Sequence, residues 1–285
     1  MSTPRITTIL TTAALAAALP PAAAGADSLV TAAPGAKALA GGGGYLAWSA
    51  PTPDGRWQLT VRAPGGTVSH PAVAAFARPV RVSIGSTAPY GASRRLVATY
   101  ARDGDAYELD LARGAETRLA ALSTRAEETL VAVGLGRYVV VRRGLGTYSY
   151  GPGGRAVRLT KSVPSQIAMS QSRVASIEGG RIVIRRLSGH GRALVAGRNL
   201  ADPSSLWLTR YRAGYATYTG QAGAKLYGTR RFAGSGGPYT LRVIGDPWSS
   251  PGPIDGIVVD GHGEPGYYLD ADGVERFSPT PFHGR

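Results

Sequence analysis

The stretch "LVATYARDGDAYELDLARGAETRLA", residues 96–120, contains three short runs in which apolar and polar residues alternate. Alternation with period two is typical of β-strands that bury one face. Asp103-Gly104 and Gly114 separate the runs, and these residue types accept the positive φ angles of tight turns. The stretch therefore predicts three antiparallel strands joined by hairpins.

The same pattern recurs along the chain. Its best-defined strand appears as "YLAWS" at Tyr45, "LVATY" at Leu96, "YVVV" at Tyr138, "VASI" at Val174, "YATYT" at Tyr215 and "IVVD" at Ile257. These starts are separated by 51, 42, 36, 41 and 42 residues, a period typical of four-stranded propeller blades. A further strand precedes most of them, as in "VRVSI" and "QIAMS", and is least distinct in the first and last repeats. The sequence predicts an all-β fold, a β-propeller of about six four-stranded blades, with five or seven left open.

Two segments resemble the blades of TolB-like bacterial propellers, residues 45–68 ("YLAWSAPTPDGRWQLTVRAPGGTV") and residues 96–120. The shared pattern is a strand, a DG turn, an E-L-x-V-like strand, a second Gly turn and an R-L-T ending. Asp103-Gly104, Glu108-Leu109 and Thr117-Arg118-Leu119 match it, and the later repeats match in part. The resemblance implies a blade structure with binding at the central channel and its mouth. WD-repeat propellers share the architecture but look less similar, because the Trp-Asp dipeptide is absent.

The chain ends carry two further predictions. Arg5, the apolar run of residues 6–19 and the small residues Ala24-Gly25-Ala26 form the pattern of a cleavable signal peptide over residues 1–26. An uncleaved anchor is the alternative, because one charge precedes the apolar run. Residues 27–285 are then a single propeller domain, secreted or in the cell envelope, expected as a monomer without a membrane anchor after cleavage. Propellers close by pairing the two chain ends, so "DSLVTAA" from Asp27 is expected to complete the last blade.

The composition restricts the partners less than its net charge suggests. The formal charge is +14 and there is no cysteine, so neither a lipid-bearing thiol nor a disulfide is available. Such a charge favours anionic partners. However, three basic residues are lysines and the other 29 are arginines scattered along the sequence, which is typical of a GC-rich genome and a solvated surface.

Two segments contain candidate binding residues, and no segment matches a catalytic or metal motif. Arg210, Tyr211 and Arg212 follow the strand "LWLT", whose Trp207 is expected in the core between blades. Asp260, His262 and Glu264 form an acidic loop before "GYYLDADG". With Asp270 and Asp272 they raise calcium binding or acid–base chemistry as alternatives to plain hairpin turns. We expect no cofactor.

These observations favour an exported, non-catalytic propeller that acts as a binding or scaffold module for envelope proteins or anionic cell-wall polymers. An extracellular polysaccharide-active enzyme, a glycosidase or lyase on the same scaffold, is the alternative. It requires two carboxylates, or a Tyr-His pair, at one mouth of the channel. Nucleic acid is not an expected partner, because the signal peptide directs the chain out of the cytoplasm.

Overall fold

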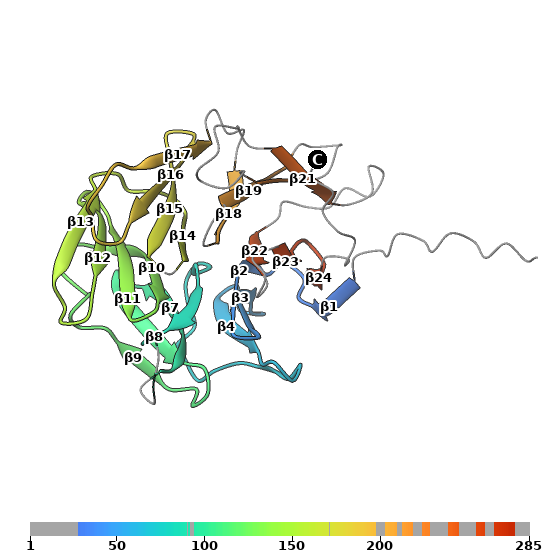
Figure 1. The fold of residues 1–285 in the computed structure, drawn as a ribbon. Helices are drawn as coiled ribbons and strands as arrows, with labels where there is room; N and C mark the ends of the chain where they lie inside the picture. Colours follow the sequence, from blue (N-terminus) through green and yellow to red (C-terminus); the bar gives the residue numbers. More distant parts are fainter. Residues whose placement is uncertain are drawn as a thin grey trace, which may run out of the picture.

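The computed structural model describes residues 28–89, 91, 94–170, 172–197, 203–209, 213–218, 224–228, 239–244, 255–259 and 265–276. Within these ranges the chain forms six four-stranded antiparallel sheets, which stand side by side around a central axis (Figure 1). The prediction of an all-β propeller is therefore confirmed. No helix in the described ranges is long and apolar enough to cross a membrane.

Each blade is a meander of four strands, with the inner strand at the axis and the fourth at the rim. Blade 1 is β2 (Lys37–Gly42), β3 (Tyr45–Pro51), β4 (Trp57–Arg62) and β5 (Val68–Ser69). Blade 2 is β6 (Ser83–Ser86), β7 (Leu96–Arg102), β8 (Asp105–Asp110) and β9 (Glu116–Arg118). Blade 3 is β10 (Glu128–Gly134), β11 (Arg137–Arg142), β12 (Gly146–Tyr150) and β13 (Ala156–Thr160).

The second half of the ring repeats this arrangement. Blade 4 is β14 (Ile167–Ser170), β15 (Arg173–Glu178), β16 (Arg181–Arg186) and β17 (Leu194–Gly197). Blade 5 is β18 (Pro203–Leu208), β19 (Ala213–Tyr218), β20 (Ala224–Gly228) and β21 (Tyr239–Ile244). Blade 6 is β22 (Gly256–Val259), β23 (Pro265–Leu269), β24 (Gly273–Arg276) and β1 (Ser28–Ala32).

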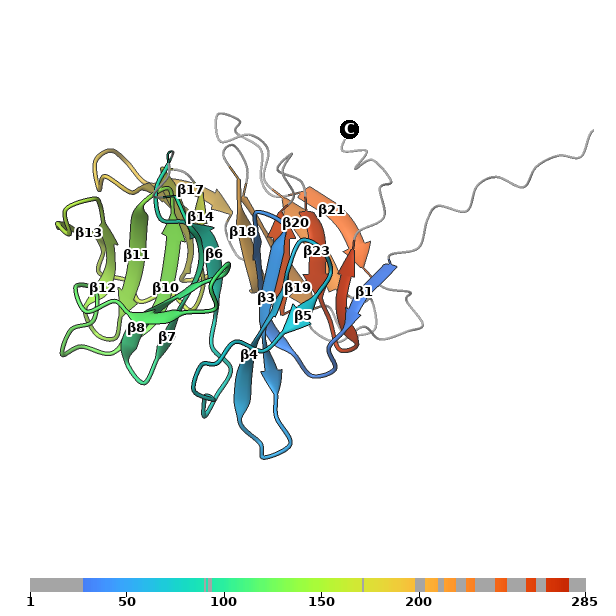
Figure 2. The same ribbon diagram turned by 90° about the horizontal axis from the view of Figure 1, so that it is seen from below.

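The meanders give the ring two distinct faces, because neighbouring strands run in opposite directions (Figure 2). On one face the inner strands begin. The connections between blades and the turns between second and third strands lie there, and we call it the entrance face. On the opposite face the inner strands end, and the remaining turns of each blade lie there.

Tight turns carry the backbone conformations that the sequence predicted. Asp103 and Gly104, between β7 and β8, have φ angles of 51° and 83°. Gly179 and Gly180, between β15 and β16, have φ angles of 54° and 68°. Two consecutive positive φ angles are the mark of a type I′ hairpin, whose twist matches that of the flanking strands.

The ring is closed by the N-terminal strand. β1 pairs antiparallel with β24, with Ser28 opposite Arg276 and Ala32 opposite Gly273, and Figure 1 shows blue β1 beside red β24. The prediction that the segment from Asp27 completes the last blade is confirmed.

The sequence-based alignment of the last repeat was wrong by one strand. The repeat pattern predicts a second strand at "IVVD", but Ile257 lies in β22, the inner strand of blade 6. "GYYL" is then the second strand and Gly273–Arg276 the third, so β1 supplies the fourth. The proline-rich residues 247–253 precede the inner strand rather than replacing it, which is compatible with the rule that Pro disrupts a strand interior.

The core lies between adjacent blades. Leu59 of blade 1 packs with Tyr100 and Leu109 of blade 2, and all three are fully buried. A polar link joins the same blades, since Ser49 Oγ donates to Val80 O at 2.9 Å and accepts from Val80 N at 3.0 Å. Trp207 is 2% exposed, as predicted for a core position.

Two tyrosines, Tyr100 fully buried and Tyr138 half-buried, give the fold a dependence on high pH. Tyr100 donates to Glu116, and Tyr138 donates to Glu108 at 2.6 Å. Burial, and then the hydrogen bond to a carboxylate, raise the pKa of both phenols far above their usual value near 10. Above about pH 10 the unfolded chain therefore loses protons that the folded chain keeps, so stability falls as pH rises.

We expect the urea midpoint to fall above about pH 10, and to fall less steeply when both tyrosines are replaced by phenylalanine. Chemical denaturation between pH 8 and 11 measures this. Equal slopes in the wild-type and double-variant chains would exclude the two phenols as the cause.

Candidate functional site

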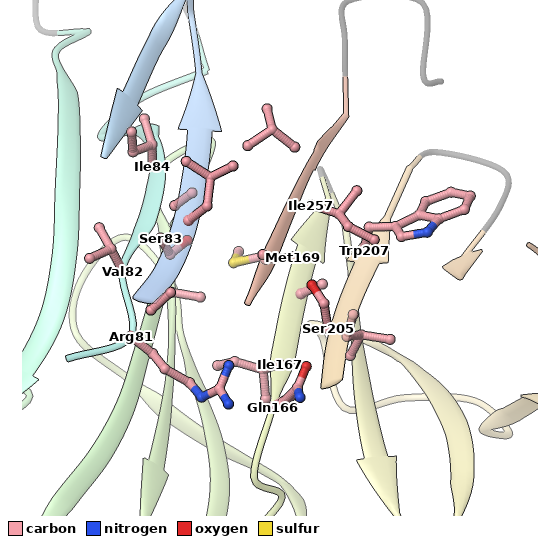
Figure 3. Close-up of a pocket in the computed structure, with 18 of the residues that line it drawn as sticks. Arg81, Val82, Ser83, Ile84, Gln166, Ile167, Met169, Ser205, Trp207 and Ile257 are labelled. Carbon is pink, nitrogen blue, oxygen red and sulfur yellow. The ribbon is translucent and has the colours of Figure 1, made fainter. Parts of the chain in front are cut away.

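A cavity of about 260 Å³ lies on the ring axis. All six inner strands line it, and Figure 3 shows side chains from several of them converging on the same space. Most of the side chains that line it are apolar, Ile84, Met169 and Ile257 among them, although polar atoms make up much of its accessible wall. The volume is slightly below the usual range of small-molecule pockets and suits a single side chain or a group of similar size.

Polar residues gather where the cavity opens on the entrance face. Arg81 precedes β6, Gln166 precedes β14 and Asp255 precedes β22. Arg81 and Gln166 extend toward each other at one end of the cavity (Figure 3). Ser205 of β18 lies on the wall nearby. Equivalent ends of the inner strands thus bring together hydrogen-bonding groups that are far apart in sequence.

Lys37 and Arg81, two cations near this opening, differ in whether a carboxylate of the chain pairs with them. Lys37 Nζ binds Asp255 Oδ2 at 2.5 Å, so this charge is compensated. Arg81 takes part in none of the ion pairs formed among the described residues. Among the described residues that line the cavity, Arg81 is therefore a guanidinium whose charge can be compensated by a ligand.

The surroundings of Arg81 favour an anion. Its side chain is exposed to solvent, but the cavity walls surround it and desolvate the charge. Desolvation lowers the pKa of Arg81, and the negative charge of Asp255 opposes the shift. An arginine stays protonated at neutral pH in any case. A charged group that has lost part of its hydration gains most from a carboxylate or phosphate that replaces the missing water.

A groove of about 830 Å³ adjoins the cavity on the entrance face. It is lined by the loops over blades 2 and 3, chiefly residues 76–81, 101–105 and 124–130. Arg81 lines both the groove and the cavity, so the two spaces meet at its side chain. A ligand that lies in the groove can therefore place one acidic group against Arg81.

Ion pairs hold the walls of the groove in place. Arg78 and Arg143 both bind Glu127, at 3.3 and 2.8 Å. Beneath them Arg142 Nε binds buried Glu128 at 3.0 Å. The loops are thus fixed by contacts within the chain, and a preformed site loses less entropy on binding.

Arg210, Tyr211, Arg212, Asp260, His262 and Glu264 all lie outside the described residues. These six stay a prediction.

The hairpin interpretation of the last acidic turn is confirmed. Asp270 Oδ1 accepts the backbone N–H groups of Asp272 and Gly273 at 3.0 and 3.1 Å. The described residues contain no group of three His, Asp or Glu side chains placed to hold a metal ion. Among the described residues that line the axial cavity, Asp255 is the one carboxylate.

Sequence reasoning missed Arg81 and Gln166, although both occur in quoted inner-strand segments. Arg81 is the second residue of "VRVSI", and Gln166 is the first of "QIAMS". In a ring of inner strands, polar residues at the strand starts converge on the axis. An alignment of the repeats on these starts would have indicated them.

Comparison with known proteins supports the fold. Neither a protein-family model nor a curated protein matches the chain. A chain in the crystal structure of a nidogen/laminin complex superimposes with a TM-score of 0.52 and 10% sequence identity, covering 70% of this chain and 77% of that chain. At this identity the likeness concerns the propeller architecture alone.

Proposed function

We propose that this chain is an exported, non-catalytic binding module that recognises an acidic group of a partner protein at the entrance of its central channel. The observation that carries the proposal is the position of Arg81, an exposed guanidinium without an ion-pair partner among the described residues, where the groove meets the axial cavity. A carboxylate binds such a guanidinium through paired hydrogen bonds.

A protein segment suits this site better than a wall polymer. Apolar side chains such as Ile84 and Met169 line the cavity beyond its opening, which fits a short apolar stem that carries a carboxylate. A repeating polyanion would bring many charges to a face where Lys37, Arg78, Arg118 and Arg143 are already paired with carboxylates. The similar chain from the nidogen/laminin complex, a complex of proteins, is compatible with this use of the fold.

Export and family membership are parts of the same proposal. The signal-peptide pattern of residues 1–26 ends just before β1, so cleavage would leave the closing strand at the new N-terminus. The blade motifs around Asp103-Gly104 and Glu108-Leu109 support a TolB-like propeller of the bacterial cell envelope. The partner would then be another envelope protein.

A peptide-display selection on the chain from Asp27 tests the proposal. We expect the enriched peptides to share a carboxylate, either an Asp or Glu side chain or a free C-terminus. Arg81→Gln should weaken their binding about tenfold or more, because a hydrogen bond to a charged group contributes about 1.5–3 kcal/mol. Fluorescence anisotropy with a labelled peptide measures the change.

Arg181→Gln is the matched control. Arg181 is exposed at the start of β16, on the entrance face, and lines neither the cavity nor the groove. It removes the same charge and should leave peptide affinity unchanged. A selection without enrichment, or peptides that bind the Arg81→Gln chain as tightly as the wild-type chain, would contradict the proposal.

A further inference from the structure

The face opposite the entrance carries a concentration of arginines. Six of them span blades 1 to 4, and we call them the arginine-rich face: Arg62, Arg94, Arg113, Arg137, Arg155 and Arg186. Arg62 and Arg137 are half-buried and the other four are exposed.

Topology places all six on one face. Arg62 ends β4 and Arg186 ends β16, so both lie where third strands end. Arg94 and Arg137 precede or begin second strands, after the turns that leave the inner strands. The two others occupy turns between third and fourth strands. In an antiparallel meander these positions are at the same end of every blade.

The positive charge on this face is not compensated within the described chain. None of the six takes part in an ion pair among the described residues. The carboxylates that approach the face are already engaged. Glu108 and Asp110 bind Arg95 at 3.0 and 3.2 Å, and Glu116 binds Arg102 at 2.7 Å.

The entrance face carries more carboxylates than the arginine-rich face. Carboxylates occur at its turns and connections in each of blades 1 to 4, at Asp54, Asp103, Asp105, Glu127 and Glu178. Some of them pair with cations of the same face, as Glu127 does with Arg78 and Arg143, so positive and negative charges there partly offset one another. In the part of the chain that the structure describes, the arginine-rich face has fewer carboxylates to offset its cations. An excess of positive charge on one surface attracts and orients a polyanion.

A cavity of about 410 Å³ lies within the arginine-rich face, between blades 1 and 2. Its lining combines Tyr45 and Leu96 with Arg94 and Arg113. Asp110 lines it as well, with its charge compensated by the ion pair to Arg95. An aromatic ring beside two guanidiniums suits a flat ring that bears an anionic group, which is the chemistry of an acidic sugar. The face therefore combines a long-range electrostatic attraction with a place for one sugar unit.

We propose that the arginine-rich face binds a linear acidic polysaccharide, with carboxylate or phosphate groups along its chain bound by the six arginines and one sugar held in the cavity beside Tyr45. This site lies on a different face from the channel entrance and takes a different ligand, so it does not depend on the binding of a protein there. The propeller would join a protein partner on one face to an anionic polymer on the other.

Binding to immobilised polygalacturonate tests the proposal, with neutral dextran as the reference polymer. We expect binding to polygalacturonate and none to dextran. Affinity should fall about tenfold to a hundredfold between about 50 and 200 mM salt if about four charges are contacted. A quadruple variant should bind polygalacturonate about tenfold or more weakly than the wild-type chain at low salt. It combines Arg62→Gln, Arg94→Gln, Arg113→Gln and Arg137→Gln.

A control variant that removes the same number of positive charges distinguishes a binding site from a general effect of net charge. It removes four exposed cations of blades 1 to 4 at the entrance face: Arg56→Gln, Arg118→Gln, Lys161→Gln and Arg181→Gln. The control should bind polygalacturonate like the wild-type chain. Equal losses of affinity in the two quadruple variants would overturn the proposal. A wild-type chain that does not bind polygalacturonate would overturn it too.

Two further variants separate the possible outcomes. Tyr45→Leu keeps an apolar side chain, so it should lower affinity for polygalacturonate without changing the salt dependence. Arg81→Gln should leave polygalacturonate binding unchanged, so a failed channel site and a failed arginine-rich face are distinguishable. Tighter binding of single-stranded DNA than of polygalacturonate would overturn the assignment to a polysaccharide.

Discussion

A chain that lacks residues 28–32 is expected to melt on the order of 10 °C below the chain that begins at Asp27. β1 forms the outer strand of blade 6, and four of its residues are in register with β24. Its loss removes the backbone hydrogen bonds of that ladder, each with a net contribution of about 0.5–1.5 kcal/mol. It also removes the link that joins the two ends of the chain and leaves the edge of β24 open to other chains.

Leu29→Ser is the matched control for this deletion. The Leu29 side chain is 55% exposed, so its replacement leaves the backbone ladder in place and changes little buried area. Its melting temperature should stay within about 2 °C of the parent chain. Differential scanning calorimetry compares the three chains. Equal melting temperatures for the deletion and the parent would show that β1 does not close the ring.

Gly85→Ala is expected to destabilise the propeller by about 3 kcal/mol or more, or to prevent folding. A Cβ atom at Gly85, in β6, would lie 2.1 Å from the carbonyl oxygen of Val133 and 2.8 Å from its carbonyl carbon, in β10. Both atoms belong to the backbone, so no side-chain rotation relieves the contact. The inner strands of blades 2 and 3 would have to separate, and overpacking that displaces backbone is at the costly end of core substitutions.

Gly134→Ala is the control for Gly85→Ala, because Gly134 also lies in an inner strand. A Cβ there would meet the end of Met169 at 3.5 Å, an ordinary contact with a flexible side chain. We expect its free energy of unfolding to stay within about 1 kcal/mol of wild type. Urea denaturation of the two variants gives the comparison. A Gly85→Ala chain as stable as Gly134→Ala would contradict the close approach of β6 and β10.

The repeat architecture was predictable because its signals are local. Alternation of apolar residues specifies each strand, and pairs such as Asp103-Gly104 specify each hairpin. The error in the last repeat has a physical cause as well. A strand of blade 6 comes from the far end of the chain, so the last repeat in the sequence holds three strands and not four. Periodicity alone does not reveal which strand is missing.

The candidate sites were less predictable, since both depend on which residues the ring brings together. Arg81 does not stand out among 29 arginines until the start of its strand is placed on the axis. Ion pairs are equally hard to predict from the sequence, because partners such as Arg78 and Glu127 are 49 positions apart. The charge of the chain looked evenly scattered in sequence, yet the meander sends Arg94 and Arg137 to one face and Asp103 and Glu127 to the other.

The central claim is that an acidic group of a partner is bound by Arg81 at the channel entrance. A crystal structure of the chain with a selected peptide tests it most directly. We predict a carboxylate of the peptide within hydrogen-bond distance of the Arg81 guanidinium, with the adjoining residues of the peptide in the groove over blades 2 and 3. A peptide seated on the outer strands, or one that directs a basic side chain to Asp255, would contradict the account.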